Sequence, residues 1–323
     1  MEIGIIANPK AGKGWRELEA VHRFAAKQGI TIIVTNHISE ISRALIKLLK
    51  EKNVKILLVY GGDGTLQKVI DILIFEKARG AIRELPLIIS LGGGTMLAVH
   101  RWLGWKRRPI SIIKKITRTP IAHLPRRKLR PLQIHFTNEQ GQEETRYGFI
   151  FNLGAIARII ERYSSEGSSF GNAVKHTVLG ISAGIAGFPL SHKRMISQFN
   201  ARMLADDKEI EQSQPLTIIC SVTESLLFGA APFKSQRESN QFYAICYEKT
   251  ATKIAFLIPL LMRGTFVPPT SKFFNEPVFS FEVVPESEQM FNLDGEVFYV
   301  KKKTKIRVEL GPEIEFIPAF RKR

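Results

Sequence analysis

Short apolar runs separated by amphipathic stretches dominate the first 120 residues of the chain. The short runs predict buried strands, and the stretches between them have the 3.6-residue spacing of helices with one apolar face. Strands and helices that alternate in this way form a mainly parallel sheet with helices on both faces. The predicted strands are Ile3–Ala7, Thr31–Thr35, Ile56–Tyr60 and Leu87–Ser90, and the predicted helices are Trp15–Lys27, Ser39–Lys50, Leu66–Phe75 and Met96–Leu103.

After about residue 120 the pattern changes to short β-rich segments interrupted by polar turns. This pattern is typical of an antiparallel β-sandwich. We therefore expect an α/β domain over residues 1–120 and a sandwich domain over residues 121–313, while a last strand, Ile314–Ile317, could belong to either. The predicted sandwich strands are Leu132–Phe136, Arg146–Phe151, Met195–Leu204, Leu216–Val222, Phe242–Tyr247, Val278–Val284, Val297–Lys301 and Lys305–Glu309, with helices at Ala155–Tyr163 and Ala173–Gly187.

Three glycine-rich loops each follow a predicted strand of the first domain: residues 8–14, 61–65 and 92–95. In a parallel α/β sheet, ligands bind outside the carboxyl ends of the strands. Glycines at such ends let backbone N–H groups approach a phosphate closely. None of the loops has the Walker A spacing or the Gly-x-Gly-x-x-Gly pattern of nicotinamide dinucleotide folds.

A carboxylate, Asp63, stands inside the second glycine loop. A bound phosphate would repel it unless a divalent cation bridges the two or the carboxylate organises the loop. A turn-forming Asp is the alternative interpretation.

These residues resemble the diacylglycerol kinase catalytic-domain superfamily, which includes bacterial lipid kinases and sphingosine and ceramide kinases and is more distantly related to NAD kinases. The resemblance extends over nearly the whole chain and rests on five motifs in the family's order. They are Asn8-Pro9 with Gly12, Gly61-Gly62-Asp63-Gly64-Thr65-Leu66, Gly94-Thr95 with Arg101 and Leu103-Gly104, Arg263-Gly264, and Asp294-Gly295-Glu296.

The resemblance implies an ATP-dependent lipid kinase that uses Mg²⁺ and transfers the γ-phosphoryl group to a hydroxyl of a diacylglycerol-like or sphingoid lipid. The α/β domain would bind the nucleotide through Asn8, Pro9, Gly12, Thr35, Gly61, Gly62, Asp63, Gly64, Thr65, Gly94 and Thr95. Asp63 would organise the phosphates and contact the metal through the nucleotide. Glu296 or Asp294 would be the catalytic base, with Glu296 slightly preferred. A hairpin turn is the alternative interpretation of Asp294-Gly295.

The chain departs from the family pattern at three places. Gln67-Lys68 stands where the family usually has Asn-Glu, and Leu97-Ala98 where it usually has Asn-Asp. The bacterial branch has a structural metal at an Asp-Gly turn, and the equivalent turn here is Ser239-Asn240. We therefore expect that metal site to be absent or weak. Catalysis could be altered or lost.

The formal charge of +17 favours polyanionic partners. Positive residues concentrate between Arg101 and Arg130, beside Trp102 and Trp105, and would suit an anionic membrane surface. A solvated basic surface and two packed tryptophans are the plain alternative. With buried cysteines (Cys220, Cys246), no signal-peptide pattern and no long apolar run, we expect a cytoplasmic protein, either free or peripheral at the inner membrane surface.

Three functions remain open: a lipid kinase, a non-catalytic nucleotide- or lipid-binding protein of the same fold, and an NAD kinase-like enzyme. The residues at 67, 68, 97 and 98 favour the second. The Gly-Gly-Asp-Gly loop is shared with the third. Only the positive charge supports nucleic-acid binding, so this function is not expected. The sequence identifies neither the acceptor lipid nor the oligomeric state.

Overall fold

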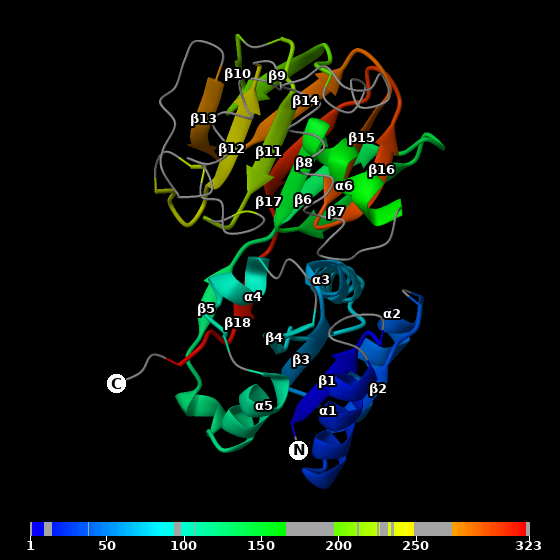
Figure 1. Ribbon diagram of the computed structural model, residues 1–323, viewed down its shortest axis with the longest axis vertical. Helices are drawn as coiled ribbons and strands as arrows, with labels where there is room; N and C mark the ends of the chain where they lie inside the picture. Colours follow the sequence, from blue (N-terminus) through cyan, green and yellow to red (C-terminus); the bar gives the residue numbers. More distant parts are fainter. Residues whose placement is uncertain are drawn as a thin grey trace. The chain divides into compact units, whose positions relative to one another are not determined.

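A computed structural model describes residues 2–9, 15–37, 39–93, 98–106, 108–165, 197–211, 213–224, 226, 232–233, 236–248 and 273–320. The chain folds into two compact units. Unit 1 comprises Met1–Arg130 and Pro312–Arg323, and unit 2 comprises Pro131–Gly311. The chain therefore leaves unit 1 once and returns to it at the end (Figure 1).

Unit 1 is built on a six-stranded sheet with the order β2-β1-β3-β4-β18-β5. The pairs among the first five of these strands are parallel, and only β5 runs antiparallel to its neighbour. Every residue of the adjacent interior strands β1 and β3 is buried, as expected for a sheet with helices on both faces. The strands are β1 (Ile3–Ala7), β2 (Thr31–Val34), β3 (Ile56–Gly61), β4 (Leu87–Gly93), β5 (Arg127–Leu129) and β18 (Ile314–Phe316).

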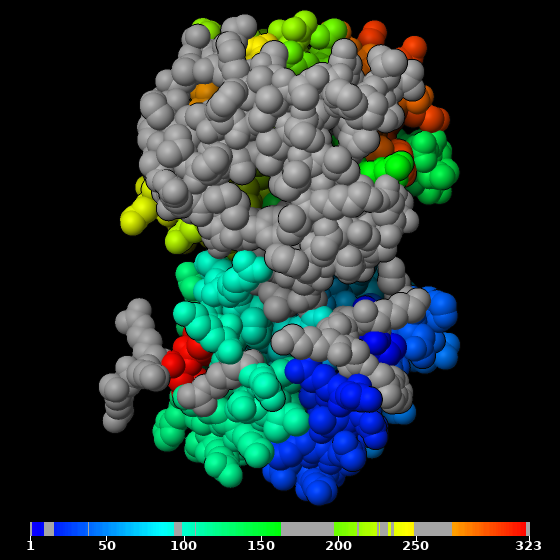
Figure 2. Space-filling model, viewed as in Figure 1, coloured from blue at the N-terminus to red at the C-terminus, as the bar shows by residue number. Residues whose placement is uncertain are grey.

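Helices of unit 1 form two groups by their contacts. Helices α1 (Trp15–Lys27) and α5 (Pro109–Thr117) lie side by side, and in Figure 2 they share the visible face of this unit. The Lys114 ammonium of α5 lies 5.5 Å from the ring centre of Phe24 on α1. Helices α2 (Ser39–Ile46) and α3 (Asp63–Ala78) contact each other, and α4 (Ala98–Trp102) contacts α3 and β4.

Several boundaries in unit 1 differ from those predicted. Helix α3 begins at Asp63, inside the glycine motif, and α2 ends at Ile46 in a π-helical turn, Lys47–Glu51. Helix α5 was not predicted because its segment was interpreted only as a basic stretch. Its signals were Pro109 at the first position and isoleucines at helical spacing. Strand β5 was also missed.

Unit 2 consists of two six-stranded antiparallel sheets. One, here called the β6 sheet, has the order β10-β9-β14-β17-β6-β7, and the other, the β8 sheet, has the order β13-β12-β11-β8-β15-β16. Helix α6 (Ala155–Ser165) contacts β8 and β15. The strands are β6 (Leu132–Thr137), β7 (Glu143–Gly148), β8 (Ile150–Gly154), β9 (Ala201–Ala205), β10 (Lys208–Glu209), β11 (Thr217–Ser221), β12 (Phe242–Tyr247), β13 (Phe273–Val278), β14 (Phe281–Pro285), β15 (Gln289–Leu293), β16 (Glu296–Val300) and β17 (Ile306–Leu310).

Aromatic side chains fill the space between the two sheets. Phe136 of the β6 sheet meets Phe291 of the β8 sheet edge to face, with ring centres 4.9 Å apart. Phe298 stacks on Phe291 at 5.0 Å. The sulfur atoms of Cys246 and Met203 also meet across the sheets, 3.6 Å apart. These contacts join the sheets into a sandwich with one core.

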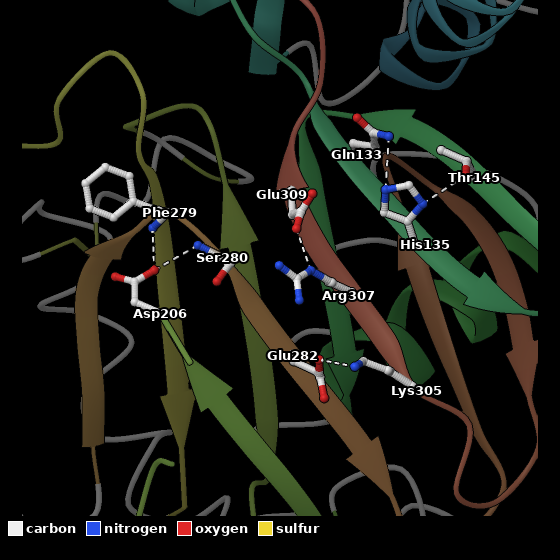
Figure 3. Close-up of polar contacts among 10 residues, drawn as sticks. All are labelled: Gln133, His135, Thr145, Asp206, Phe279, Ser280, Glu282, Lys305, Arg307 and Glu309. Carbon is white, nitrogen blue, oxygen red and sulfur yellow. Dashed lines mark hydrogen bonds and ion pairs between the residues drawn. The ribbon is translucent and has the colours of Figure 1, made fainter. Parts of the chain in front are cut away.

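Polar side chains cover the other face of the β6 sheet (Figure 3). Strand β6 alternates buried and half-buried positions, which leaves His135 facing outward to Thr145 Oγ1 at 3.0 Å. Lys305 pairs with Glu282 at 2.7 Å, and Arg307 pairs with Glu309. Solvent screens such partly exposed pairs, so they contribute little to stability.

Turns in unit 2 lie at places where the sequence pattern was continuous. The predicted strand Val278–Val284 is two strands, β13 and β14, separated at Phe279-Ser280, where Asp206 Oδ1 accepts both backbone N–H groups at 2.8 and 2.9 Å (Figure 3). Strand Arg146–Phe151 is likewise divided between β7 and β8. The predicted helix Ala173–Gly187 and the start of the strand Met195–Leu204 lie outside the described residues.

The predicted fold class is confirmed: a mainly parallel α/β unit is followed by an antiparallel β-sandwich. The last strand returns to unit 1, where Phe316 pairs with Ile88 of β4. In the part of the chain that the structure describes, no helix has the length and apolar character needed to cross a membrane.

Candidate functional site

The parallel sheet of unit 1 reverses its winding direction between β1 and β3. Strand β1 connects to β2 on one side, and β3 connects to β4 on the other (Figure 1). Ligands of open α/β sheets bind at such a switch point, outside the carboxyl ends of the strands. Here those ends carry Asn8 and Gly61, the first residues of two of the predicted loops.

A direct hydrogen bond joins these two loops. Asn8 Nδ2 donates to Thr65 Oγ1 at 3.0 Å, and the Asn8 backbone N–H donates to Tyr60 O at 2.9 Å. A Cβ atom at Gly61 would lie only 2.5 Å from Thr65 Cβ, so this position has no room for a side chain. The structure thus brings the Asn8 and Gly61–Thr65 motifs together.

The third loop reaches the same place through an irregularity in the sheet. The pairing of β3 with β4 shifts by one residue between Val59 and Tyr60, so that Tyr60 lies opposite Gly92. Gly92 and Gly93 have φ of +76° and +136°, values that side-chain-bearing residues rarely adopt. A Cβ at Gly93 would stand 3.4 Å from Gly61 N. The ends of β3 and β4 therefore approach each other backbone to backbone. Bulges of this kind are common beside active sites.

His100 on α4 packs beneath this third loop. Its Nδ1 lies 2.8 Å from Ser90 O, and its ring would lie 3.4 Å from a Cβ at Gly92. Burial lowers the pKa of His100, against an opposing effect of the Ser90 hydrogen bond, and Arg101 lowers it further. A neutral imidazole that donates to Ser90 accounts for this contact. Sequence reasoning missed His100 because no metal-ligand spacing or catalytic partner marked it.

Helix α3 starts directly behind the second loop. Gly62 is its N-cap and Asp63 its first residue. The amide groups of this first turn point toward the switch point, and the helix dipole favours negative charge there. This arrangement suits a phosphate. It equally suits the Asp63 carboxylate, so the loop-organising role expected of Asp63 has a local physical basis.

The departures at 67 and 68 lie on this helix. Gln67 is fully buried, and Lys68 is half-buried one residue further along. Lys68 thus stands near the N-terminal end of α3, where the resemblance implies a carboxylate. Leu97 lies outside the described residues, and Ala98 is the first residue of α4.

Strand β3 is also tied to α1, the helix that follows the first loop. Tyr60 OH donates to Glu17 Oε2 at 3.1 Å. Burial and the negative charge of Glu17 raise the pKa of Tyr60, so the phenol stays protonated and keeps this bond. The start of α1 is therefore fixed beside the switch point.

The structure describes some of the remaining motif residues and not others. Thr35 is buried and donates its backbone N–H to Ala7 O at 2.9 Å, so it follows the strand next to β1. Pro9 is half-buried after Asn8. Outside the described residues lie Gly12, Gly94, Thr95, Arg263 and Gly264.

In unit 2, Asp294 and Gly295 form the two-residue turn of the β15–β16 hairpin. Their φ values are +51° and +100°, which is the combination that Asp-Gly supplies in such turns. Both carboxylate oxygens of Asp294 accept backbone N–H groups: Oδ2 from Phe149 at 2.6 Å and Oδ1 from Ile150 at 3.0 Å. Asp294 thus fixes the turn to the start of β8.

Glu296 opens β16 immediately after this turn and pairs with Leu293. Its side chain is half-buried. Gly148 makes the arrangement possible, because a Cβ there would lie 2.6 Å from Asp294 Oδ2. The two candidate carboxylates therefore differ: Asp294 is committed to backbone donors, and Glu296 follows on the strand that the turn orients.

No group of three or more His, Cys, Asp or Glu side chains that could hold a metal is found among the described residues. Asp63 is a single carboxylate, so it could contact a metal only together with ligands from a bound phosphate.

A glycine-lined switch point with a helix N-terminus, followed along the chain by a β-sandwich unit, places the protein in the class of diacylglycerol kinase-like folds. Residues 2–125 match the family model described as the diacylglycerol kinase catalytic domain, and the predicted resemblance to that superfamily is confirmed. No curated protein sequence matches the chain.

Solved structures share the fold over almost the entire chain. A diacylglycerol kinase from Bacillus anthracis str. Sterne aligns with a TM-score of 0.64 at 16% identity, covering 98% of this chain and 96% of that one. Two further structures from the same organism, described provisionally as diacylglycerol kinases, align with TM-scores of 0.69 and 0.67 at 16% and 18% identity. Both cover 98% of this chain, and 96% and 97% of their own chains. Identity this low shows the fold alone.

Proposed function

We propose that the chain is an ATP-dependent lipid kinase that phosphorylates a hydroxyl of a diacylglycerol-like or sphingoid lipid. The observation that carries the proposal is the junction of Asn8, Gly61 and Thr65 at the switch point, beside the N-terminus of α3, an arrangement that suits a phosphate. The match of residues 2–125 to the diacylglycerol kinase catalytic domain supports it.

The residues fit the phosphates of a nucleotide because glycines keep side chains away from the places where the loop backbones approach most closely. A Cβ at Gly61 would collide with Thr65, and Gly93 brings its backbone next to that of Gly61. Successive N–H groups in such loops form a concave site for anions. Asn8 holds Thr65 in place, and Asp63 stands in the first turn of α3, where the helix dipole favours its negative charge. Bound Mg²⁺ would neutralise phosphate charge.

On the lipid side, we assign Glu296 as the base that accepts the proton of the acceptor hydroxyl. The contacts of Asp294 support this choice, because both its oxygens already accept N–H groups from Phe149 and Ile150. Asp294 then orients the hairpin from which Glu296 projects. A base must reach the proton it removes, and a side chain held by two backbone amides has little freedom to do so.

The proposed partner surface is an anionic membrane, contacted through the basic segment 101–130. Part of its charge is already neutralised: Arg126 pairs with Glu315 at 3.0 Å, and Lys128 pairs with Glu313 at 2.7 Å. Trp105 is buried and donates Nε1–H to Ile317 O, so it packs in unit 1 and does not serve as an interfacial anchor. Trp102 lies under the Arg127 guanidinium, 3.5 Å from ring centre to Cζ.

Sedimentation with vesicles tests this surface. Binding to phosphatidylglycerol-containing vesicles should exceed binding to pure phosphatidylcholine and should fall with salt, since each basic residue near an anionic surface contributes about 1 kcal/mol. Equal binding to both vesicle types would refute it.

Turnover with labelled ATP tests the kinase proposal. The protein is incubated with Mg²⁺, labelled ATP and either mixed lipids or NAD, and the product that gains label is identified. Label in a lipid supports the proposal, and label on NAD would assign an NAD kinase-like activity. Nucleotide binding without transfer would assign a non-catalytic binding protein, the outcome that Lys68 in place of a carboxylate favours.

Matched variants test the residue roles. Asp63→Asn should weaken nucleotide binding and transfer, and Glu296→Gln should abolish transfer while leaving nucleotide binding unchanged. Glu288→Gln, an exposed glutamate of the same unit, is the control and should retain full activity. Full activity of Glu296→Gln would remove it from the role of base.

A further inference from the structure

An arginine side chain organises the turn that leads into β12. The family resemblance implies a structural metal at this turn, but its residues here, Ser239 and Asn240, are neutral and exposed. The turn is closed by a backbone hydrogen bond from Gln241 N to Glu238 O at 3.2 Å. Arg237 stands directly before it.

The Arg237 guanidinium donates to carbonyl oxygens on both sides of the turn. Nη1 donates to Gln241 O at 2.8 Å and to Glu238 O at 3.1 Å, and Nη2 donates to Val222 O at 2.8 Å. Carbonyl oxygens that converge on one point are the usual ligands of a hard divalent cation. Here a permanently charged side chain satisfies them.

Aromatic rings support the guanidinium from one side. Its Cζ lies 5.8 Å from the ring centre of Tyr243, which is itself stacked on Phe233 with ring centres 4.2 Å apart. Cation–π contact favours a planar, weakly hydrated cation over a strongly hydrated metal ion. A divalent ion in the same place would also be repelled by the guanidinium charge.

The bond to Val222 connects Arg237 to the candidate catalytic hairpin. Val222 N donates to Phe149 O at 3.1 Å, and Phe149 N donates to Asp294 Oδ2 at 2.6 Å. A series of hydrogen bonds therefore runs from the guanidinium, through the backbones of Val222 and Phe149, to the turn that precedes Glu296. Arg237 and this turn therefore lie at the same end of the β8 sheet.

We propose that Arg237 is an internal cation that takes the structural place of the metal, so that this end of the β8 sheet is held without a bound ion. The residues do not fit a metal: Ser239 and Asn240 lack the carboxylate that the resemblance implies, Glu238 beside them is exposed, and the guanidinium already occupies the carbonyls. The proposal concerns stability and is independent of whether the protein transfers phosphate.

Thermal unfolding of the wild-type protein tests directly whether a bound metal ion stabilises it. The midpoint should be the same in EDTA and after addition of excess Mg²⁺ or Ca²⁺. A midpoint that falls in EDTA and recovers with either ion would overturn the proposal, whatever the result of the kinase assay.

Variants of Arg237 test the side chain. Arg237→Ala should lower the midpoint by roughly 5 °C or more, because three charge-assisted hydrogen bonds are lost. Arg237→Lys keeps the charge, but a compact ammonium cannot span carbonyls on both sides of the turn, so it should recover less than half of the loss.

Arg202→Ala is the matched control, since Arg202 lies in the same unit, has a side chain that is 61% exposed and pairs with the equally exposed Glu209. Its midpoint should change by no more than about 2 °C. If Arg237→Ala were as stable as Arg202→Ala, or if Arg237→Lys matched the wild type, the proposed role of the guanidinium would be wrong.

Discussion

Replacing Asp294 by Ala should destabilise unit 2, whereas replacing Glu296 by Gln should affect only catalysis. The two residues belong to one motif, yet their contacts differ. Asp294 accepts the N–H groups of Phe149 and Ile150, which are 0% and 6% exposed. Without the carboxylate, both donors are left unsatisfied.

Each buried donor left without an acceptor costs about 1–3 kcal/mol. Asp294 itself is only half-buried, so water can reach part of the vacated space, and we expect a total loss of roughly 2–4 kcal/mol. Alanine also tolerates the positive φ of this position less well than aspartate does. Asn at position 294 keeps one acceptor and the φ preference, so Asp294→Asn should lose about half as much.

Urea unfolding followed by far-UV circular dichroism, which detects the β-sheets of unit 2, measures these free energies. Glu296→Gln should stay within about 0.5 kcal/mol of the wild type and should lose roughly 10²–10⁴-fold in transfer rate. The reasoning is refuted if Asp294→Ala unfolds at the wild-type urea concentration, or if Glu296→Gln is the less stable of the two.

Two further predictions concern unit 1. Gly61→Ala should cost about 1–3 kcal/mol of folding stability by overpacking against Thr65, and it should reduce nucleotide binding, measured by equilibrium dialysis. Gly80→Ala is the control for binding, because a Cβ there meets nothing within 4 Å, and it should leave nucleotide binding unchanged. Equal binding by the two variants would contradict the packing argument. The pKa of His100 is lowered from 6.5, so the unfolded chain binds the proton more readily. The contribution of His100 to folding stability is complete above the pKa that it has in the unfolded chain. This contribution is lost as the pH falls through the lower pKa of His100 in the folded protein. His100→Gln should therefore flatten the decline in thermal midpoint on the acid side of pH 6.5, and an unchanged slope would show that other groups cause it.

Local patterns were sufficient for the architecture of this protein. Buried runs such as Ile56–Tyr60 and the glycine loops that follow them are short-range signals, because strand burial and turn conformation depend on neighbouring residues. The Asp294-Gly295 turn was also readable, since its positive φ values need those residue types. Helix α5 was not predicted because its segment was interpreted from its positive charge and not from the spacing of its isoleucines.

The sequence by itself determined that the chain has three glycine loops after parallel strands and an Asp-Gly-Glu hairpin in a β-rich half. Only the tertiary structure decided what these residues contact across the chain: Asn8 with Thr65, Asp294 with the start of β8, and Arg237 with the carbonyl group of Val222. The reason is that such partners are far apart in the chain, and a hydrogen bond between them leaves no trace in the local pattern of apolar and polar residues. In the sequence, Asp294 and Glu296 are two carboxylates two positions apart, with nothing to distinguish them. The structure distinguishes them, because Asp294 accepts the backbone N–H groups of residues 149 and 150.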